Sequence, residues 1–225
     1  MGECVTNCCQ PTLWRICACH ARERDAQRPP SPPEINAILA AAAPHVQRVI
    51  VLGMYTGARI GPSELFRLEW RDVDLEQAMI RMPSAHKNNR QDARDVPIRR
   101  ALLPLLRQWR QQDAARGIAT VISWRGRPLR SITRAWHTAL EKAGIERRIR
   151  PYDLRRAYAT YALAGGADIK TIADLMGHTD ASMILKTYQH VLDSQRREAQ
   201  EAMPDILRLD SAPLREQPPG LQRAA

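Results

Sequence analysis

Apolar residues recur at helical spacing in the first third of the chain, after a proline-rich start. The spacing predicts one helix over Ile35–Ala43 and a second over Val46–Tyr55, and the second is apolar enough to be buried. Thr56-Gly57 breaks the second helix, and Pro62-Ser63-Glu64 restarts a short one. The N-terminal part of the globular region is therefore expected to be helical.

The pattern then changes from helical spacing to short extended runs. Three strands are predicted near residues 70–74, 78–83 and 94–98, with a polar turn at His86–Arg90 between the second and the third. From Arg99 onward most of the chain is expected to be helical, over residues 99–115, 131–143, 152–165, 168–176, 180–187 and 189–202. The fold class is thus mainly α with a small three-stranded antiparallel sheet (α+β).

The ends of the chain differ in composition from the middle. Residues 1–28 contain all five cysteines, whose spacing does not give two C-x-x-C pairs, so this segment is expected to be disordered or a remnant rather than a zinc knuckle. Ser31 then caps a helix entered through prolines, and Glu34 completes a capping box. We expect a catalytic domain over residues 29–205 and a tail over 206–225.

Charge adds a preference for a polyanionic partner. The 225 residues have a net charge of +10, and Lys87, Lys142, Lys170 and Lys186 are the only lysines, so arginine supplies most of the 34 basic residues. A merely basic soluble protein remains an equally good explanation of charge alone. No apolar run reaches the ~20 residues of a membrane span and no signal peptide is evident, so we expect a cytoplasmic protein with reduced thiols.

Several side chains could act on a phosphate, although each has an ordinary explanation as well. Arg59 follows the break at Thr56-Gly57, and Glu64 could pair with it or simply favour the helix dipole. Lys87 is placed in a strand-joining turn, where it could deliver a proton or only improve solubility. Arg155 is expected at the edge of an apolar helix face, where a surface arginine is the usual interpretation.

The stretch from Gly165 to His178 predicts a helix stop, a new capped helix and a second stop. His178 follows Gly177 at a helix end, where capping is its ordinary role, and Tyr188 would commonly be a packing residue. A helix-turn-helix DNA reader over residues 165–188 would have the same pattern and stays open at this point.

Taken together and in order, these segments resemble the tyrosine recombinases of the phage integrase family. Thr56-Gly57-Ala58-Arg59 with Glu64-Leu65 and Leu68-x-Trp70-x-Asp72-Val73-Asp74 resembles the first arginine box, and Lys87 before Asp95-Val96-Pro97-Ile98 resembles the hairpin lysine. Pro151-Tyr152-Asp153-Leu154-Arg155 resembles the second box, normally H-x-L-R. Leu175-Met176-Gly177-His178 and Lys186-Thr187-Tyr188 resemble the third histidine and the nucleophile segment. The resemblance covers about residues 31–195.

The resemblance implies a role for each residue in metal-free, cofactor-free cleavage of DNA. Arg59 and Arg155 would clamp the scissile phosphate, and His178 would donate a third hydrogen bond. Tyr188 would attack phosphorus to form a 3′-phosphotyrosine, and Lys87 would protonate the leaving 5′-oxygen. Tyr152 stands where histidine is usual, and its phenol can still donate a hydrogen bond.

The resemblance also implies partners, and it leaves alternatives. Double-stranded DNA and a homotetramer assembled on it are expected, with no membrane and a location at the nucleoid. The family's usual helical domain ahead of the catalytic one is not recognised in residues 1–28, which suggests a truncated gene, a mis-assigned start or a domain that works without the clamp. A non-catalytic DNA-binding remnant and a type IB topoisomerase are the rival functions. The first arginine box also has two extra residues, Gly61-Pro62, between Arg59 and Glu64, relative to the R-x-x-E spacing that is commonest in the family.

Overall fold

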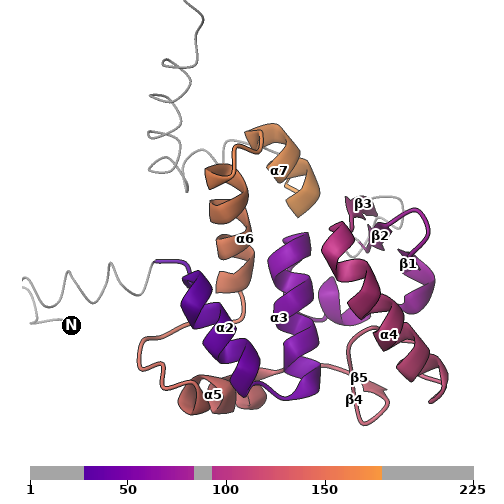
Figure 1. Ribbon diagram of the computed structural model, residues 1–225, viewed down its shortest axis with the longest axis horizontal. Helices are drawn as coiled ribbons and strands as arrows, with labels where there is room; N and C mark the ends of the chain where they lie inside the picture. The colour runs from indigo at the N-terminus through magenta and orange to yellow at the C-terminus, as the bar shows by residue number, and fades with distance from the viewer. Residues whose placement is uncertain (1–27, 84–92, 179–225) are drawn as a thin grey trace, which may run out of the picture.

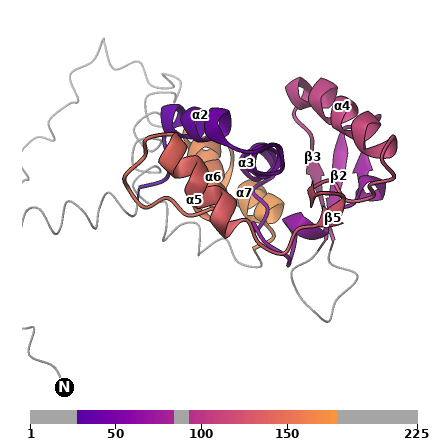
Figure 2. The ribbon, with the colours of Figure 1, turned by 90° about the horizontal axis from the view of Figure 1, so that it is seen from below.

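Helices dominate the computed structural model, which describes residues 28–83 and 93–178. Helix α3 stands in the middle, with α2, α5 and α6 on one side and α4 with the sheet on the other (Figures 1 and 2). The described α-helices are α2 (Pro32–Ala41), α3 (Pro44–Thr56), α4 (Leu103–Ala114), α5 (Thr133–Lys142), α6 (Asp153–Ala164) and α7 (Ile169–Met176). The predicted helices at 180–187 and 189–202 lie outside the described residues.

The central position of α3 follows from its sequence. Val46, Val49 and Ile50 are at most 1% exposed, as expected for a helix that is apolar around most of its circumference. It packs against α2 and α6, while α2 also packs against α5. A second, smaller apolar cluster joins α6 to α7 through Leu163 and Ile172. The C-terminal ends of α3 and α7 are therefore held near each other by packing on α6.

The predicted three-stranded antiparallel sheet is confirmed. Strands β1 (Val73–Asp74), β2 (Met79–Met82) and β3 (Arg94–Pro97) lie in the order β1-β2-β3, and Ile80 pairs with both Val73 and Val96. The first strand is shorter than predicted, because Trp70–Asp72 forms a 3₁₀ helix in which the Asp72 carboxylate accepts from the Glu69 N–H at 3.1 Å. This local side-chain bond competes with strand pairing.

Other predicted boundaries also differ from the structure. The helix predicted from residue 99 begins as a 3₁₀ turn over Arg100–Leu102 before α4. The short helix predicted to start at Pro62 is a turn over 62–64 followed by the 3₁₀ helix Leu65–Arg67. A two-stranded hairpin, β4 (Ser123–Trp124) with β5 (Arg127–Pro128), was not predicted. Its turn residues Arg125 and Gly126 both have positive φ, which suits a tight hairpin turn.

The N-terminal capping box is confirmed. The backbone N–H and the hydroxyl of Ser31 both donate to Glu34, at 2.7 and 2.8 Å. Two side-chain nitrogens of Arg147 donate to the same carboxylate, at 2.6 and 2.8 Å. This pair ties the start of α2 to the loop before α6. Within the described residues, no helix is long and apolar enough to cross a membrane.

Candidate active site

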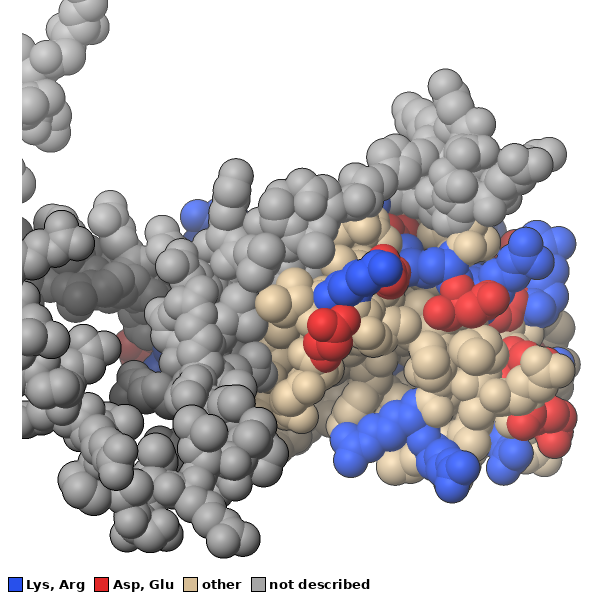
Figure 3. Space-filling model, turned by 90° about the horizontal axis from the view of Figure 1, so that it is seen from above, with Lys and Arg blue, Asp and Glu red and all other residues tan. Residues whose placement is uncertain are grey.

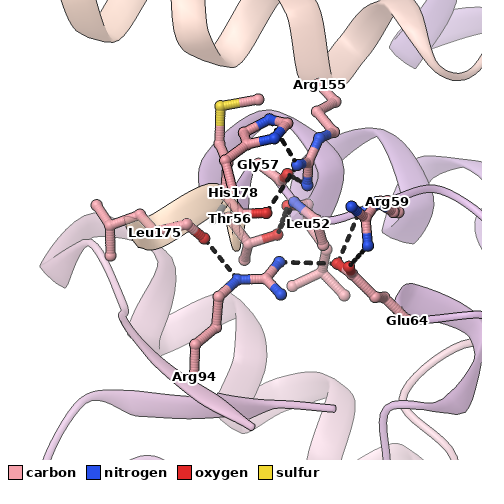
Figure 4. Close-up of polar contacts among 11 residues, drawn as sticks. Leu52, Thr56, Gly57, Arg59, Glu64, Arg94, Arg155, Leu175 and His178 are labelled. Atoms are coloured by element: carbon pink, nitrogen blue, oxygen red, sulfur yellow. Dashed lines mark hydrogen bonds and ion pairs between the residues drawn. The ribbon is translucent and has the colours of Figure 1, made fainter. Parts of the chain in front are cut away.

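The C-terminal end of α3, the start of α6 and the end of α7 meet at one place. Gly57 ends α3 with a φ of +62°, and a Cβ at this position would lie 2.5 Å from the Tyr158 ring. The Thr56 hydroxyl supports the same turn, because it donates to Leu52 O and accepts from the Ala58 N–H. Only glycine suits both the left-handed backbone and the close approach of α6. The turn places Arg59 beside the other two helix ends (Figure 4).

Arg155 occupies the centre of this meeting point. One terminal nitrogen donates to Gly57 O at 2.5 Å and the other to Met176 O at 2.7 Å, so the side chain joins the ends of α3 and α7. It is 1% exposed, so the interpretation of Arg155 as an ordinary surface arginine was wrong. Helix ends supply carbonyl oxygens without partners in the helix, and these make the burial of a guanidinium tolerable.

The electrostatics of Arg155 reflect this burial. Desolvation lowers the pKa of its guanidinium, and the Glu64 carboxylate opposes that change. Arginine remains protonated under such conditions, so the site retains a fixed positive charge. The Nε atom is buried and has no hydrogen-bond partner among the described residues. Buried donors without a partner are uncommon in folded proteins.

Arg59 is held by Glu64, which is completely buried. The Arg59 backbone N–H donates to one carboxylate oxygen at 2.9 Å, and its side chain donates to the other at 3.1 Å. The Arg59 side chain is still 31% exposed. Of the two explanations offered for Glu64, the ion pair is confirmed. The helix-dipole explanation does not fit, because Glu64 precedes a single 3₁₀ turn.

Arg94 is a member of the site that the sequence did not indicate. It is the first residue of β3, and it donates to Glu64 Oε2 at 2.7 Å and to Leu175 O at 2.6 Å. Burial alone would raise the pKa of the Glu64 carboxyl. The hydrogen bond and charge of Arg94, together with the Arg59 N–H and the charge of Arg155, outweigh it, and the pKa is lowered. A basic residue at a strand start has no distinctive sequence pattern, so only the contacts reveal its place.

His178 completes the described part of the site. Its Nε2 atom lies 3.1 Å from an Arg155 terminal nitrogen, and because that nitrogen can only donate, Nε2 is an acceptor. The proton of a neutral ring is then on Nδ1. Burial, followed by the charges of Arg155, Arg59 and Arg94, lowers the pKa of His178 from 6.5. The neutral ring can still donate one hydrogen bond, from Nδ1.

The remaining predicted residues have different positions. Tyr152 directly precedes α6, is 47% exposed, and is close enough to Arg155 to influence the pKa of that guanidinium. Lys87 and Tyr188 lie outside the described residues. The structure thus brings Arg59, Arg155 and His178 together, with Tyr152 beside them. The described residues contain no group of three or more His, Cys, Asp or Glu side chains placed to hold a metal ion.

The surface at this end of the molecule is basic but not uniformly so. Figure 3 shows Lys and Arg side chains in a band across the described part of the face seen from above, interrupted by Asp and Glu side chains. Such a band attracts a polyanion, and the interrupting carboxylates restrict where the attraction is strongest.

Comparison with known proteins identifies the family of this chain. The model of the phage integrase family matches residues 31–195, and the chain belongs to this family. It is 26% identical over 209 residues to the tyrosine recombinase XerC-like protein of Caldanaerobacter subterraneus subsp. tengcongensis, covering 77% of this chain and 53% of that protein. The chain therefore spans about half the length of this relative.

Solved structures show the same fold. The crystal structure of XerA recombinase is 27% identical with a TM-score of 0.61, over 78% of this chain and 65% of that one. The catalytic domain of bacteriophage HP1 integrase is 22% identical with a TM-score of 0.56, over 78% of this chain and 94% of that one. The described residues thus have the fold of a tyrosine recombinase catalytic domain, as the sequence predicted.

Proposed function

We propose that this chain carries out site-specific DNA recombination, cutting and rejoining strands through a 3′-phosphotyrosine. The observation that carries the proposal is the meeting of Arg59, Arg155 and His178 at one joint, although they come from separate segments of the chain. Membership of the phage integrase family supports the proposal that this cluster binds a phosphate. Two guanidinium groups and an imidazole N–H suit the oxygens of a phosphodiester and the extra charge of its transition state.

In the proposed reaction one ester replaces another. The Tyr188 oxygen forms a bond to phosphorus while the bond from phosphorus to the 5′-oxygen breaks. Lys87 gives a proton to that oxygen, and the phenol proton goes to a base or to solvent. Because no bond is hydrolysed, the 5′-hydroxyl of another strand can reverse the step without ATP.

Cleavage of a nicked suicide substrate tests the proposal. A duplex with a nick beside the target phosphate loses a short fragment after attack, so the covalent complex accumulates and survives SDS. Tyr188→Phe is expected to abolish this complex and to leave duplex binding largely intact. Tyr161→Phe is a matched control, because the Tyr161 hydroxyl donates to Pro30 O, far along α6 from the site. An undiminished complex with Tyr188→Phe would remove the nucleophile assignment.

A second candidate function is DNA binding without cleavage. Tyr152 favours it, because a phenol is a weaker acid–base group near neutral pH than the usual histidine. A reversible gel shift with no SDS-resistant complex would support this alternative. Restored cleavage in Tyr152→His would then show that this single replacement limits the chemistry.

The proposal also covers partners and organisation. Double-stranded DNA would be the substrate, four protomers would assemble on two sites, and the protein would work in the cytoplasm at the nucleoid. The catalytic domain would span residues 29–205, with 1–28 and 206–225 as flanking segments. Light scattering of the protein with and without duplex DNA would measure the assembly.

A further inference from the structure

Arg94 is a second side chain, besides Arg155, that connects the loop after α3 to the end of α7. Its side chain is 14% exposed, and it reaches from the sheet to Glu64 on one side and to the last turn of α7 on the other (Figure 4). Helix α7 also packs against strand β3. Arg94 is therefore placed to couple the sheet, the loop of Arg59 and the helix that leads to His178.

On the first side, Arg94 stabilises the carboxylate that orients Arg59. Glu64 accepts two hydrogen bonds from Arg59 and one from Arg94, and both of its oxygens are used. A carboxylate with no solvent exposure needs this compensation, because burial without partners costs several kcal/mol. Without Arg94, Glu64 would be left with a single guanidinium, which is itself partly open to solvent.

On the second side, Arg94 fixes the end of α7. Its Nε donates to Leu175 O, three residues before His178. Its guanidinium also packs on Gly177, where an added Cβ would lie 2.9 Å from an Arg94 terminal nitrogen. Gly177 has a φ of +70°, so the helix turns directly into His178 at this contact. The planar guanidinium thus fills the space beneath that turn.

We propose that Arg94 is a positioning residue for strand cleavage, which sets Arg59 through Glu64 and His178 through the end of α7. Its Nε and one terminal nitrogen donate to Leu175 O and Glu64, so contacts within the protein fix the plane of its guanidinium. The role requires two donors in a fixed plane, which a lysine ammonium does not supply. This inference rests on the proposed recombinase function.

The first test needs no DNA. Hydrogen–deuterium exchange of the free protein reports on the backbone N–H of His178, which donates to Ala173 O, and on that of Gly177, which donates to Asp174 O. Arg94→Ala is expected to speed exchange over residues 173–178 at least about tenfold, as in a local opening, while α3 stays protected. Arg81→Ala is the matched control, since Arg81 lies exposed on β2 opposite Asp95. Unchanged exchange at the α7 end in Arg94→Ala overturns the proposal.

The second test measures single-turnover cleavage of the suicide substrate. Arg94→Ala and Arg94→Lys are both expected to slow covalent-complex formation about 100-fold, comparable to the loss of one transition-state donor. Duplex affinity should stay within about threefold, because non-specific affinity depends mainly on other phosphate contacts. Arg81→Ala should react at the wild-type rate. Full activity of Arg94→Lys would show that charge alone matters and would contradict the positioning role.

A methylphosphonate at the scissile position distinguishes a loss of Arg59 positioning from a general loss of protein structure. This neutral group needs less charge compensation, so a variant whose defect acts through Arg59 should lose less on it than on the phosphate. The Arg94→Ala defect is expected to shrink to about tenfold or less. An equal defect on both substrates would contradict the coupling to Arg59. If the wild-type protein forms no covalent complex, the recombinase proposal fails, and the exchange experiment still decides whether Arg94 holds the joint.

Discussion

A buried guanidinium organises the candidate site at the residue scale. Arg155 donates to backbone carbonyls at the ends of two helices, and it also contacts His178. The same group is therefore a structural connector and the proposed ligand of the phosphate. The two roles are compatible because arginine has five N–H donors, and the two carbonyls and His178 engage only some of them.

Replacing Arg155 by lysine should separate charge from geometry. Arg155→Lys keeps the positive charge but leaves Gly57 O or Met176 O without a donor, so we expect about 1–3 kcal/mol less stability. Cleavage should fall at least about 100-fold, because an ammonium supplies fewer donors, and none in a fixed plane, to the proposed phosphate. Urea denaturation and single-turnover cleavage measure the two effects. Arg156→Lys, the neighbouring arginine on α6, is the control, and an equal response of both variants would contradict a special role for Arg155.

At the residue scale, the sequence predicts where the site residues lie along the chain but not which groups they contact. The glycines at 57 and 177 marked helix ends correctly, and these ends position Arg59 and His178. The burial of Arg155 was not predicted. Helical spacing assigns a side chain to one face of its helix, but it does not show that carbonyl oxygens of other helices will accept hydrogen bonds from that side chain. Arg94 was missed because its partners Glu64 and Leu175 lie 30 and 81 positions away in sequence.

At the scale of elements, the end of α3 tolerates no side chain. Gly57→Ala would place a Cβ 2.5 Å from the Tyr158 ring and force a left-handed conformation on alanine. We expect a loss of about 2–4 kcal/mol from strain and overpacking together. Cleavage should fall as well, since Gly57 O anchors Arg155. Thermal denaturation checks the stability. Gly61→Ala is the control, because nothing lies within 4 Å of its Cβ, and equal losses in both variants would refute the argument.

The start of α2 should make stability depend on pH. The hydrogen bond from Arg147 lowers the pKa of the Glu34 carboxyl from 4.5 to about 2. A carboxyl with a depressed folded-state pKa stabilises the protein above pH 4.5, and this stabilisation disappears as the pH falls toward 2. Wild type should exceed Arg147→Ala by roughly 1–2 kcal/mol at pH 7, allowing for solvent screening. Urea denaturation from pH 7 to 3.5 should show the difference shrinking, and a constant difference would contradict the linkage.

At the scale of the whole molecule, the order of elements was predictable where local signals agreed. Prolines and a capping box marked α2, continuous apolar residues marked α3, and the predicted capped helix is α7, where Asp168 accepts from the Thr171 N–H. The β4–β5 hairpin was missed because two-residue strands have too few positions to show alternation. The three helix ends meet because α3 and α7 both pack on α6, which is a property of the assembled core rather than of any one segment.

The net charge of +10 should attract DNA through the field of the whole molecule, whereas residues of the site should contact individual phosphates. Each phosphate neutralised adds about −0.9 to the slope of log affinity against log salt concentration. Arg59→Ala should therefore reduce the steepness of that slope by about one, because Arg59 is partly exposed and proposed to bind the scissile phosphate. Arg147→Ala removes the same charge at a guanidinium paired with Glu34, and its slope should match wild type. Fluorescence anisotropy from 50 to 200 mM salt measures the slopes of wild type, Arg59→Ala and Arg147→Ala. Equal slopes for the two variants would mean that Arg59 acts only through the overall field of the protein.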